Sequence, residues 1–181
     1  QLTGVATIDA QTTEPVTQLG FDLSGLIVDE VNIDGEPAVH ATDKDKLQIT
    51  LPQPADAGDE VTVAVSYHGN PEPLASPMLG SNGFHTTADG AFVIGQPLSA
   101  STWYPVNDHP QDKATYTVAV TVPQGLAAVS NGTPEGQHTH DGWTTWRWAE
   151  QTPMASYLTT VAIGDYRVES TVHTDGRPVV T

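Results

Sequence analysis

The sequence predicts an all-β fold, either an antiparallel β-sandwich or a curved, saddle-like sheet. Apolar and polar residues alternate along many short segments that are rich in β-branched side chains. Turn dipeptides such as Asp34-Gly35 and Asn131-Gly132 separate these segments at short intervals. No segment repeats its apolar residues every three to four positions, as an amphipathic helix does. Short strands between frequent turns are typical of antiparallel sheets.

The expected strands follow one another along the whole chain. In order they are residues 2–8, 18–23, 26–33, 47–51, 60–67, 91–95, 115–122, 126–130, 143–148, 157–163 and 166–173. Residues 52–59 and 68–90 are rich in Pro and Gly and are expected to be loops. The strands 157–163 and 166–173 are expected to pair across Gly164-Asp165, and Asp175-Gly176 is expected to begin another hairpin.

The composition limits the classes of function. With 181 residues, a single domain is expected. The chain has 22 acidic and 6 basic side chains and a formal net charge of −16, which argues against nucleic acid or an anionic membrane surface as a partner. It has no Cys and no apolar run long enough to span a membrane. The first residues have neither a basic nor an apolar stretch, so no signal peptide is expected, and the chain is expected to start inside a strand.

Histidine and serine patterns give no catalytic centre. HExxH and GxSxG are both absent. His138 and His140 form an H-x-H pair, but the surrounding turn residues predict exposed histidines at a hairpin tip rather than a zinc site. Asn131-Gly132-Thr133 fits a glycosylation sequon, although a turn followed by Thr is the preferred interpretation.

Three tryptophans near residue 145 suggest two alternatives. On an extended strand, Trp146 and Trp148 share one face and Trp143 lies on the other. A platform that stacks sugars is the functional interpretation. Core packing is favoured, because a sheet protein with only three Phe needs other large side chains inside.

Residues 102–123 place a dense polar and aromatic segment directly before a plain strand. Pro105 and Pro110 fix their own backbone and bias the preceding residues towards extended geometry. Asp108 can accept hydrogen bonds from nearby backbone amides, and Lys113 can pair with Asp108 or Asp112. From the residues alone, this segment is a rigid, hydrogen-bonded corner.

The same segment resembles the N-terminal domain of the M1 family of zinc aminopeptidases. That family has Glu or Gln before Pro, then an aromatic-Pro pair, Asp, Pro, and Lys-Ala before a strand. Here the pattern reads Gln96-Pro97, Tyr104-Pro105, Asp108, Pro110 and Lys113-Ala114. LTGVATIDA, FDLSGLIVDEVNIDG, VTVAVSYHGNPEP, VPQGLAAVSNG and TPMASYLTTVAIGDY follow in the family's order over nearly the whole chain, and NDHPQDKATY is most similar to the bacterial, actinobacterial-type branch. Two positions depart from the pattern: many members have Arg in place of Ser101 and Cys in place of Val106.

The resemblance implies a single β-domain over residues 1–181 that packs on a catalytic domain of the same parent chain. It implies that the first strand and this catalytic domain are missing here, and that the missing part binds the zinc. The fragment is then expected to hold no metal and to be inactive alone. The parent enzyme would remove N-terminal residues from peptides that have a free N-terminus. A carbohydrate-binding or structural β-sandwich module is the alternative, and localisation, cytoplasmic or secreted, stays open.

One site residue follows from the resemblance. In the family, the residue at the position of Gln96 binds the free α-amino group of the substrate, and an amide oxygen is a suitable acceptor for an ammonium group. Trp103 and Tyr104 are expected either in the cleft or domain interface, or in the core. For Pro105, Asp108, Pro110 and Lys113 structural roles are expected, and no residue of this chain is expected to be catalytic or to bind metal.

Overall fold

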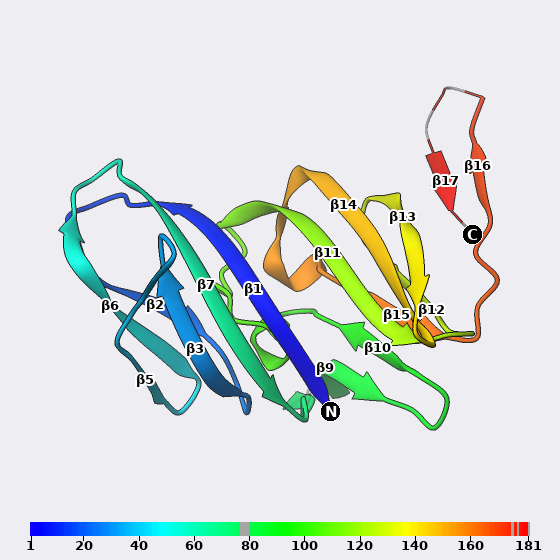
Figure 1. Ribbon diagram of the computed structural model, residues 1–181, viewed down its shortest axis with the longest axis horizontal. Helices are drawn as coiled ribbons and strands as arrows, with labels where there is room; N and C mark the ends of the chain where they lie inside the picture. Colours follow the sequence, from blue (N-terminus) through cyan, green and yellow to red (C-terminus); the bar gives the residue numbers. More distant parts are fainter. Residues whose placement is uncertain (77–79, 175, 177, 181) are drawn as a thin grey trace.

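The computed structural model describes residues 1–76, 80–174, 176 and 178–180, and it is built almost entirely of strands (Figure 1). The strands are β1 Leu2–Gln11, β2 Val16–Asp22, β3 Ile27–Ile33, β4 Glu36–Pro37, β5 His40–Asp43, β6 Lys46–Ala55, β7 Glu60–Gly69, β8 Leu74–Ser76, β9 Gly80–Thr86, β10 Ala91–Ile94, β11 Lys113–Pro123, β12 Ala127–Ser130, β13 Thr133–His140, β14 Trp143–Ala155, β15 Val161–Gly164, β16 Ser170–Val172 and β17 Pro178–Val180. Two 3₁₀ turns complete it, η1 Ala100–Thr102 and η2 Ser156–Leu158. The predicted all-β fold is confirmed.

The N-terminal half is a sandwich of two antiparallel sheets, with strand orders β1-β7-β3-β4 and β2-β6-β5. Burial alternates along β6 and β7, as expected for strands with one face on a core. The inward side chains form one apolar cluster that includes Val31, Leu47, Ile49, Val63 and Val65. This cluster explains why the alternating pattern in this half predicted its strands well.

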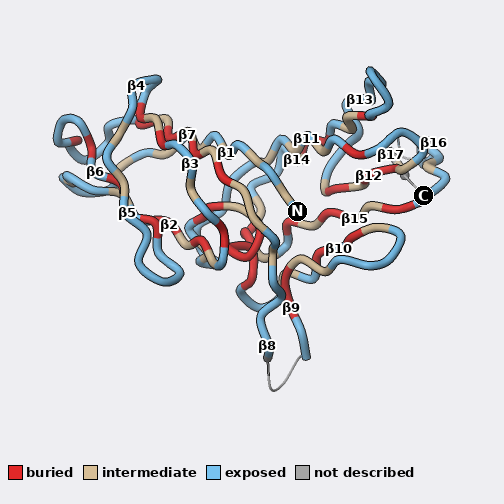
Figure 2. Tube along the Cα trace, turned by 60° about the horizontal axis from the view of Figure 1, so that its bottom comes forward, coloured by how far each residue is buried: buried red, intermediate tan, exposed pale blue. Residues whose placement is uncertain are grey.

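The C-terminal half contains the sheets β12-β15-β10-β9-β8 and β11-β14-β13. Its smaller core joins Val93 of β10 and Val161 of β15 to Trp103, with Val118 and Val120 of β11 packed against them. The β16–β17 hairpin lies at one end of the molecule, beside the C-terminus (Figure 1). Figure 2 shows buried residues gathered in the middle of the molecule and exposed residues along the outer loops.

Several predicted boundaries were wrong. Residues 68–90 are not one loop, because β8 and β9 lie within them and pair with each other. Strand β6 continues through Pro52 to Ala55, since Ala55 pairs with Val16. In these places pairing with a distant strand extends the sheet through residues that favour loops locally.

The predicted hairpin across Gly164-Asp165 is also wrong. Residues 156–158 form η2, and β15 begins only at Val161. Strand β15 pairs with β10 and β12, whereas β16 pairs with β17. The dipeptide Asp175-Gly176 includes Asp175, which lies outside the described residues.

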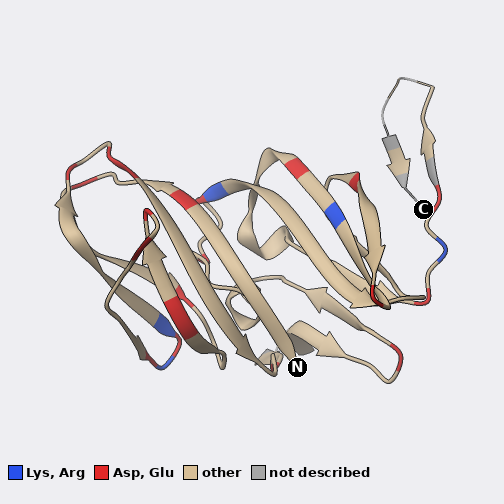
Figure 3. Ribbon diagram, viewed as in Figure 1, with Lys and Arg blue, Asp and Glu red and all other residues tan. Residues whose placement is uncertain are grey.

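Charged residues are distributed unevenly between the two signs. Acidic residues are spread over both halves and basic residues are few (Figure 3). In the part of the chain that the structure describes, no helix has the length and apolarity needed to span a bilayer.

Candidate functional site

Gln96 lies in an exposed turn directly after β10. The backbone on both sides of it is held firmly. Ser99 is fully buried, and its hydroxyl Oγ lies 2.9 Å from the carbonyl oxygen of Gly95 and 3.1 Å from that of Ile94. The Gln96–Pro97 peptide bond is cis. The Gln96 side chain therefore extends to solvent from a turn whose backbone is fixed by buried partners.

Gly95 fixes the same turn through close packing. A Cβ atom at this position would lie 2.0 Å from the carbonyl oxygen of Tyr157 in η2. No side chain fits at that distance, so only glycine allows β10 to approach η2 so closely. On the other side, Thr102 donates a 2.7 Å hydrogen bond from its hydroxyl to the carbonyl oxygen of Ser99 and is itself buried.

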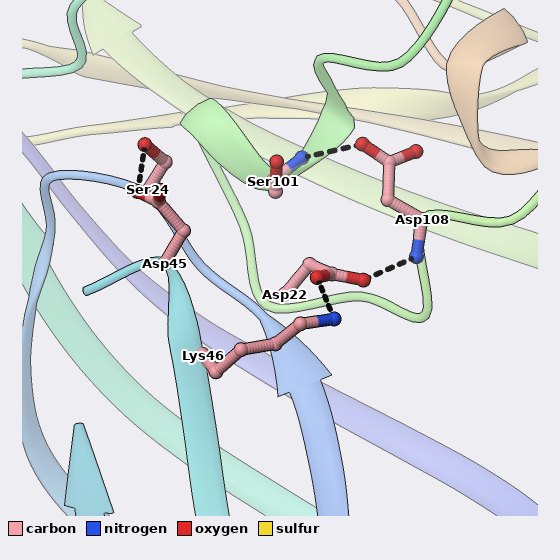
Figure 4. Close-up of polar contacts among 6 residues, drawn as sticks. All are labelled: Asp22, Ser24, Asp45, Lys46, Ser101 and Asp108. Carbon is pink, nitrogen blue, oxygen red and sulfur yellow. Dashed lines mark hydrogen bonds and ion pairs between the residues drawn. The ribbon is translucent and has the colours of Figure 1, made fainter. Parts of the chain in front are cut away.

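The predicted rigid corner is confirmed, and its partners come from distant segments. The Asp108 carboxylate accepts hydrogen bonds from the Ser156 hydroxyl at 2.8 Å and from the Ser101 backbone N–H at 3.4 Å. The backbone N–H of Asp108 donates to the Asp22 carboxylate at 3.1 Å. Asp22 also forms an ion pair with Lys46 (Figure 4). The corner thus connects the two halves of the domain.

Backbone hydrogen bonds strengthen this connection. The Asp22 N–H donates to the Val106 carbonyl at 2.6 Å, and the Val106 N–H donates to the Asp22 carbonyl at 3.1 Å. The Ser24 N–H donates to the Ser101 carbonyl at 2.8 Å, while the Ser24 hydroxyl donates to Asp45 at 2.7 Å (Figure 4). The two departures from the family pattern, Ser101 and Val106, therefore contribute through their backbone.

The predicted ion pair of Lys113 is wrong. Asp108 is occupied by Ser156 and Ser101, and Asp112 accepts a 2.7 Å hydrogen bond from the Asn107 side chain. Lys113 is exposed at the start of β11, and among the described residues it makes no ion pair. The corner is held by hydroxyl, amide and backbone donors instead of an ammonium group.

Within this corner, the side chains of Trp103 and Tyr104 pack towards the core. Their rings meet edge to face with centroids 4.5 Å apart, and the Trp103 ring lies 6.5 Å from that of Phe84. The Tyr104 hydroxyl is 3.1 Å from the Thr159 hydroxyl. Burial raises the pKa of the Tyr104 hydroxyl far above its ordinary value, so it stays protonated. The Trp103 indole nitrogen is buried and has no hydrogen-bond partner.

The tryptophans of β14 do not form a common exposed platform. The indole N–H groups of Trp146 and Trp148 donate to the carbonyl oxygens of Leu126, at 3.2 Å, and Ala128, at 2.9 Å. Trp148 is 1% exposed, whereas Trp143 is 52% exposed. The core-packing interpretation is confirmed for Trp148, and Trp143 stands apart as a surface residue.

Two smaller motifs are also located. The Asn131 side chain donates to the Leu158 carbonyl at 3.0 Å and accepts from the Thr160 N–H at 2.7 Å, which favours the turn interpretation over an acceptor for glycosylation. His138 and His140 lie at the end of strand β13, next to the turn of the β13–β14 hairpin, so their predicted position at a hairpin tip is confirmed, although β13 was not among the expected strands. They are exposed, as predicted, and the turn follows them at Asp141-Gly142.

Sequence reasoning missed the residues that hold the site. Asp22, Ser24, Ser99, Ser156 and Thr159 were not singled out, and most of their contacts cross more than 20 positions of sequence. Four of them lie in segments that carry the family resemblance, but nothing in those segments indicates which side chains hold the turn. Each of these residues forms a hydrogen bond with a residue of the segment 94–108. Ser24 also forms one with Asp45.

The described residues do not provide a set of ligands for a catalytic zinc ion. Over residues 1–76, 80–174, 176 and 178–180, no three His, Cys, Asp or Glu side chains come together as a metal site. A catalytic zinc needs three such ligands and an open position. The described residues alone therefore do not provide the three ligands of a catalytic zinc site.

The fold defines an antiparallel, all-β sandwich domain with an ordered turn at its surface. Residues 1–158 match the family described as the peptidase M1 N-terminal domain. The chain therefore belongs to the peptidase M1 N-terminal domain family.

Similar proteins agree with this family. Human glutamyl aminopeptidase is 29% identical over 85 residues, 46% of this chain and 9% of that protein. Aminopeptidase N of Haemonchus contortus is 29% identical over 132 residues, 67% of this chain and 13% of that protein. The chain thus spans only a small part of these curated relatives.

Solved structures match almost the whole chain. The M1 zinc metallopeptidase of Deinococcus radiodurans superposes with a TM-score of 0.92 at 26% identity, over 98% of this chain and 41% of that one. A mutant of that metallopeptidase bound to a Tyr-Ser-Ala substrate matches with a TM-score of 0.90 over 98% of this chain and 42% of that one.

Proposed function

We propose that residues 1–181 form a single N-terminal β-domain that caps the substrate site of a zinc-dependent aminopeptidase. The family match over residues 1–158 is the observation that carries this proposal. The partners are a catalytic domain of the same parent chain, which holds the zinc, and a peptide with a free N-terminus. The sequence of residues 107–116, NDHPQDKATY, supports a parent enzyme of the bacterial, actinobacterial type.

Gln96 is the proposed contact for the α-amino group of the substrate. Its side chain is exposed, and Ser99 and Gly95 hold the backbone of its turn. The Gln96 amide oxygen can accept a hydrogen bond from an ammonium group. Because the backbone of the turn is already held, less of it has to be ordered on binding. A site built for this contact disfavours blocked N-termini, because its acceptors are then left unpaired. Trp103 is part of the smaller core and Tyr104 packs against both cores, which favours core packing over a position in the cleft for these two residues.

The parent gene provides the first test of this function. Beyond codon 181 it should encode HExxH followed by a further Glu, the ligand set of a zinc peptidase. The parent protein should then hydrolyse Tyr-Ser-Ala, the substrate named in a matched structure. A parent gene without any metal-ligand motif would contradict the proposed function.

Gln96→Ala is expected to impair the parent enzyme selectively. Loss of a hydrogen bond to a charged group costs about 1.5–3 kcal/mol, so kcat/KM for a free-amine peptide should fall about tenfold to a hundredfold. Activity on an N-acetylated peptide, already low, should change little. Steady-state kinetics with both peptides measure this difference.

Gln137→Ala provides the matched control for Gln96. Gln137 is exposed on β13, and its replacement should leave both activities unchanged. Equal kcat/KM values for Gln96→Ala and the unmodified enzyme would remove Gln96 from the site without affecting the assignment of the domain.

The 181-residue chain alone is expected to hydrolyse no peptide. Its described residues contain no group of three metal ligands, which a catalytic zinc site needs in order to activate water. Incubation of the purified chain with zinc and Tyr-Ser-Ala, followed by chromatography, measures free tyrosine. Turnover together with one equivalent of bound zinc would contradict this prediction.

A further inference from the structure

Two histidine side chains share one face of an exposed strand. His138 and His140 are two positions apart on β13, and alternate residues of a strand point to the same side. Their rings are nearly parallel, with an interplanar angle of 18° and centroids 6.5 Å apart. Strand β13 pairs with β14 and forms the edge of its sheet, and all its residues are exposed. Both rings are therefore open to a solute from solution.

This arrangement suits a transition-metal ion. We infer that His138 and His140 form a two-histidine chelating site for a borderline divalent cation, with Cu²⁺ bound more tightly than Ni²⁺ or Zn²⁺. Neutral imidazole nitrogens are preferred ligands for these ions, and affinity at a given nitrogen site is highest for Cu²⁺. Water would complete the coordination, because the strand faces solvent.

The position of both histidines on one strand keeps the conformational cost of chelation low. Metal–nitrogen bonds of about 2.0–2.1 Å require the two rings to converge on one ion. His140 is 77% exposed, so side-chain rotation can achieve this without moving the sheet. Once β13 fixes the two histidines side by side, binding of the first ring places the second at high effective concentration.

The surroundings of the pair include one carboxylate and one cation. The Asp141 carboxylate lies 3.0 Å from Nε2 of His140. A carboxylate that bonds to a ligating histidine orients the ring. Arg147 lies on the same face beyond Thr145, opposite Gly136. Its positive charge partly offsets the attraction of a metal cation to the Asp141 carboxylate. The chain as a whole carries a net charge of −16, which favours cations.

A natural reporter lies beside the site. Trp143 is directly opposite His140 in the β13–β14 register, so the two side chains share a face, and Trp143 is 52% exposed. Bound Cu²⁺ quenches nearby indole fluorescence. The contribution of Trp143 to the quenching can be isolated with Trp143→Phe, since Trp148 is buried on the opposite face.

Titration of the purified 181-residue chain with Cu²⁺ tests the inference. We expect one tight equivalent, fluorescence quenching that is greatly reduced in Trp143→Phe, and weaker binding of Ni²⁺ and Zn²⁺ by calorimetry. Loss of an outer partner at a metal site costs about tenfold to a hundredfold in affinity, so His138→Asn and His140→Asn should each cost at least as much.

Matched variants decide the outcome. His109→Asn removes an exposed histidine from outside the strand and should leave the tight equivalent intact. Far-UV circular dichroism checks that each variant is folded. An unchanged Cu²⁺ affinity in the His138→Asn/His140→Asn double variant, or an equal loss in His109→Asn, would overturn the inference.

Discussion

Replacing Trp148 with alanine is expected to lower the free energy of unfolding by about 3–5 kcal/mol. The side chain is 1% exposed and its indole N–H donates a 2.9 Å hydrogen bond to the Ala128 carbonyl. The truncation leaves a large cavity and removes the donor that connects β14 to β12. Urea unfolding of the 181-residue chain, followed by circular dichroism, measures the change.

Two further variants on β14 separate the effect of burying the ring from the effect of the indole hydrogen bond. Trp143→Ala removes the same side chain from an exposed position and should change stability by no more than about 0.5 kcal/mol. Trp148→Phe keeps most of the buried ring but loses the hydrogen bond, so its cost should lie between the two. Equal costs for Trp143→Ala and Trp148→Ala would show that Trp148 does not support the core.

The second large effect is expected at Gly95. A Cβ atom there would lie 2.0 Å from the carbonyl oxygen of Tyr157, so Gly95→Ala must displace β10 from η2. Overpacking against a backbone atom costs about 3 kcal/mol. The displacement also moves Gln96, the next residue, so kcat/KM of the parent enzyme for a free-amine peptide should fall at least as far as in Gln96→Ala.

Gly20→Ala is the matched control for Gly95→Ala. Gly20 lies in β2, and a Cβ atom there would meet nothing within 4 Å. Its replacement should be neutral or slightly stabilising, since alanine restricts the unfolded chain more than glycine does. Urea unfolding and steady-state kinetics of both variants measure the two effects. Wild-type stability in Gly95→Ala would contradict the close packing of β10 on η2.

The corner formed by residues 99–110 shows how far local sequence can predict a site. Its prolines and its Asp predicted a rigid, hydrogen-bonded segment, and this is what the structure contains. The sequence also suggested that Lys113 would hold it, which is wrong. The partners Asp22 and Ser156 lie 86 and 48 residues from Asp108, and no pattern within the segment could identify them.

The histidine pair was predicted only in part. Turn residues around His138 and His140 predicted exposed histidines at a hairpin tip, which is confirmed, but strand β13, which carries both of them, was not expected. On this strand the two histidines are neighbours on one face, which changes what they can bind. Local propensity could not predict this, because the stabilising hydrogen bonds come from the partner strand.

The sequence by itself determined the all-β class, most of the strands in the N-terminal half, and membership of the peptidase M1 N-terminal domain family. Alternation and motif order are properties of neighbouring residues, so they can be read along the chain. Only the tertiary structure decided that β15 pairs with β10 and β12, that Trp148 is buried while Trp143 is exposed, and that Gly95 lies against η2. Each of these depends on contacts between segments distant in sequence, and such contacts are fixed only when the sheets pack.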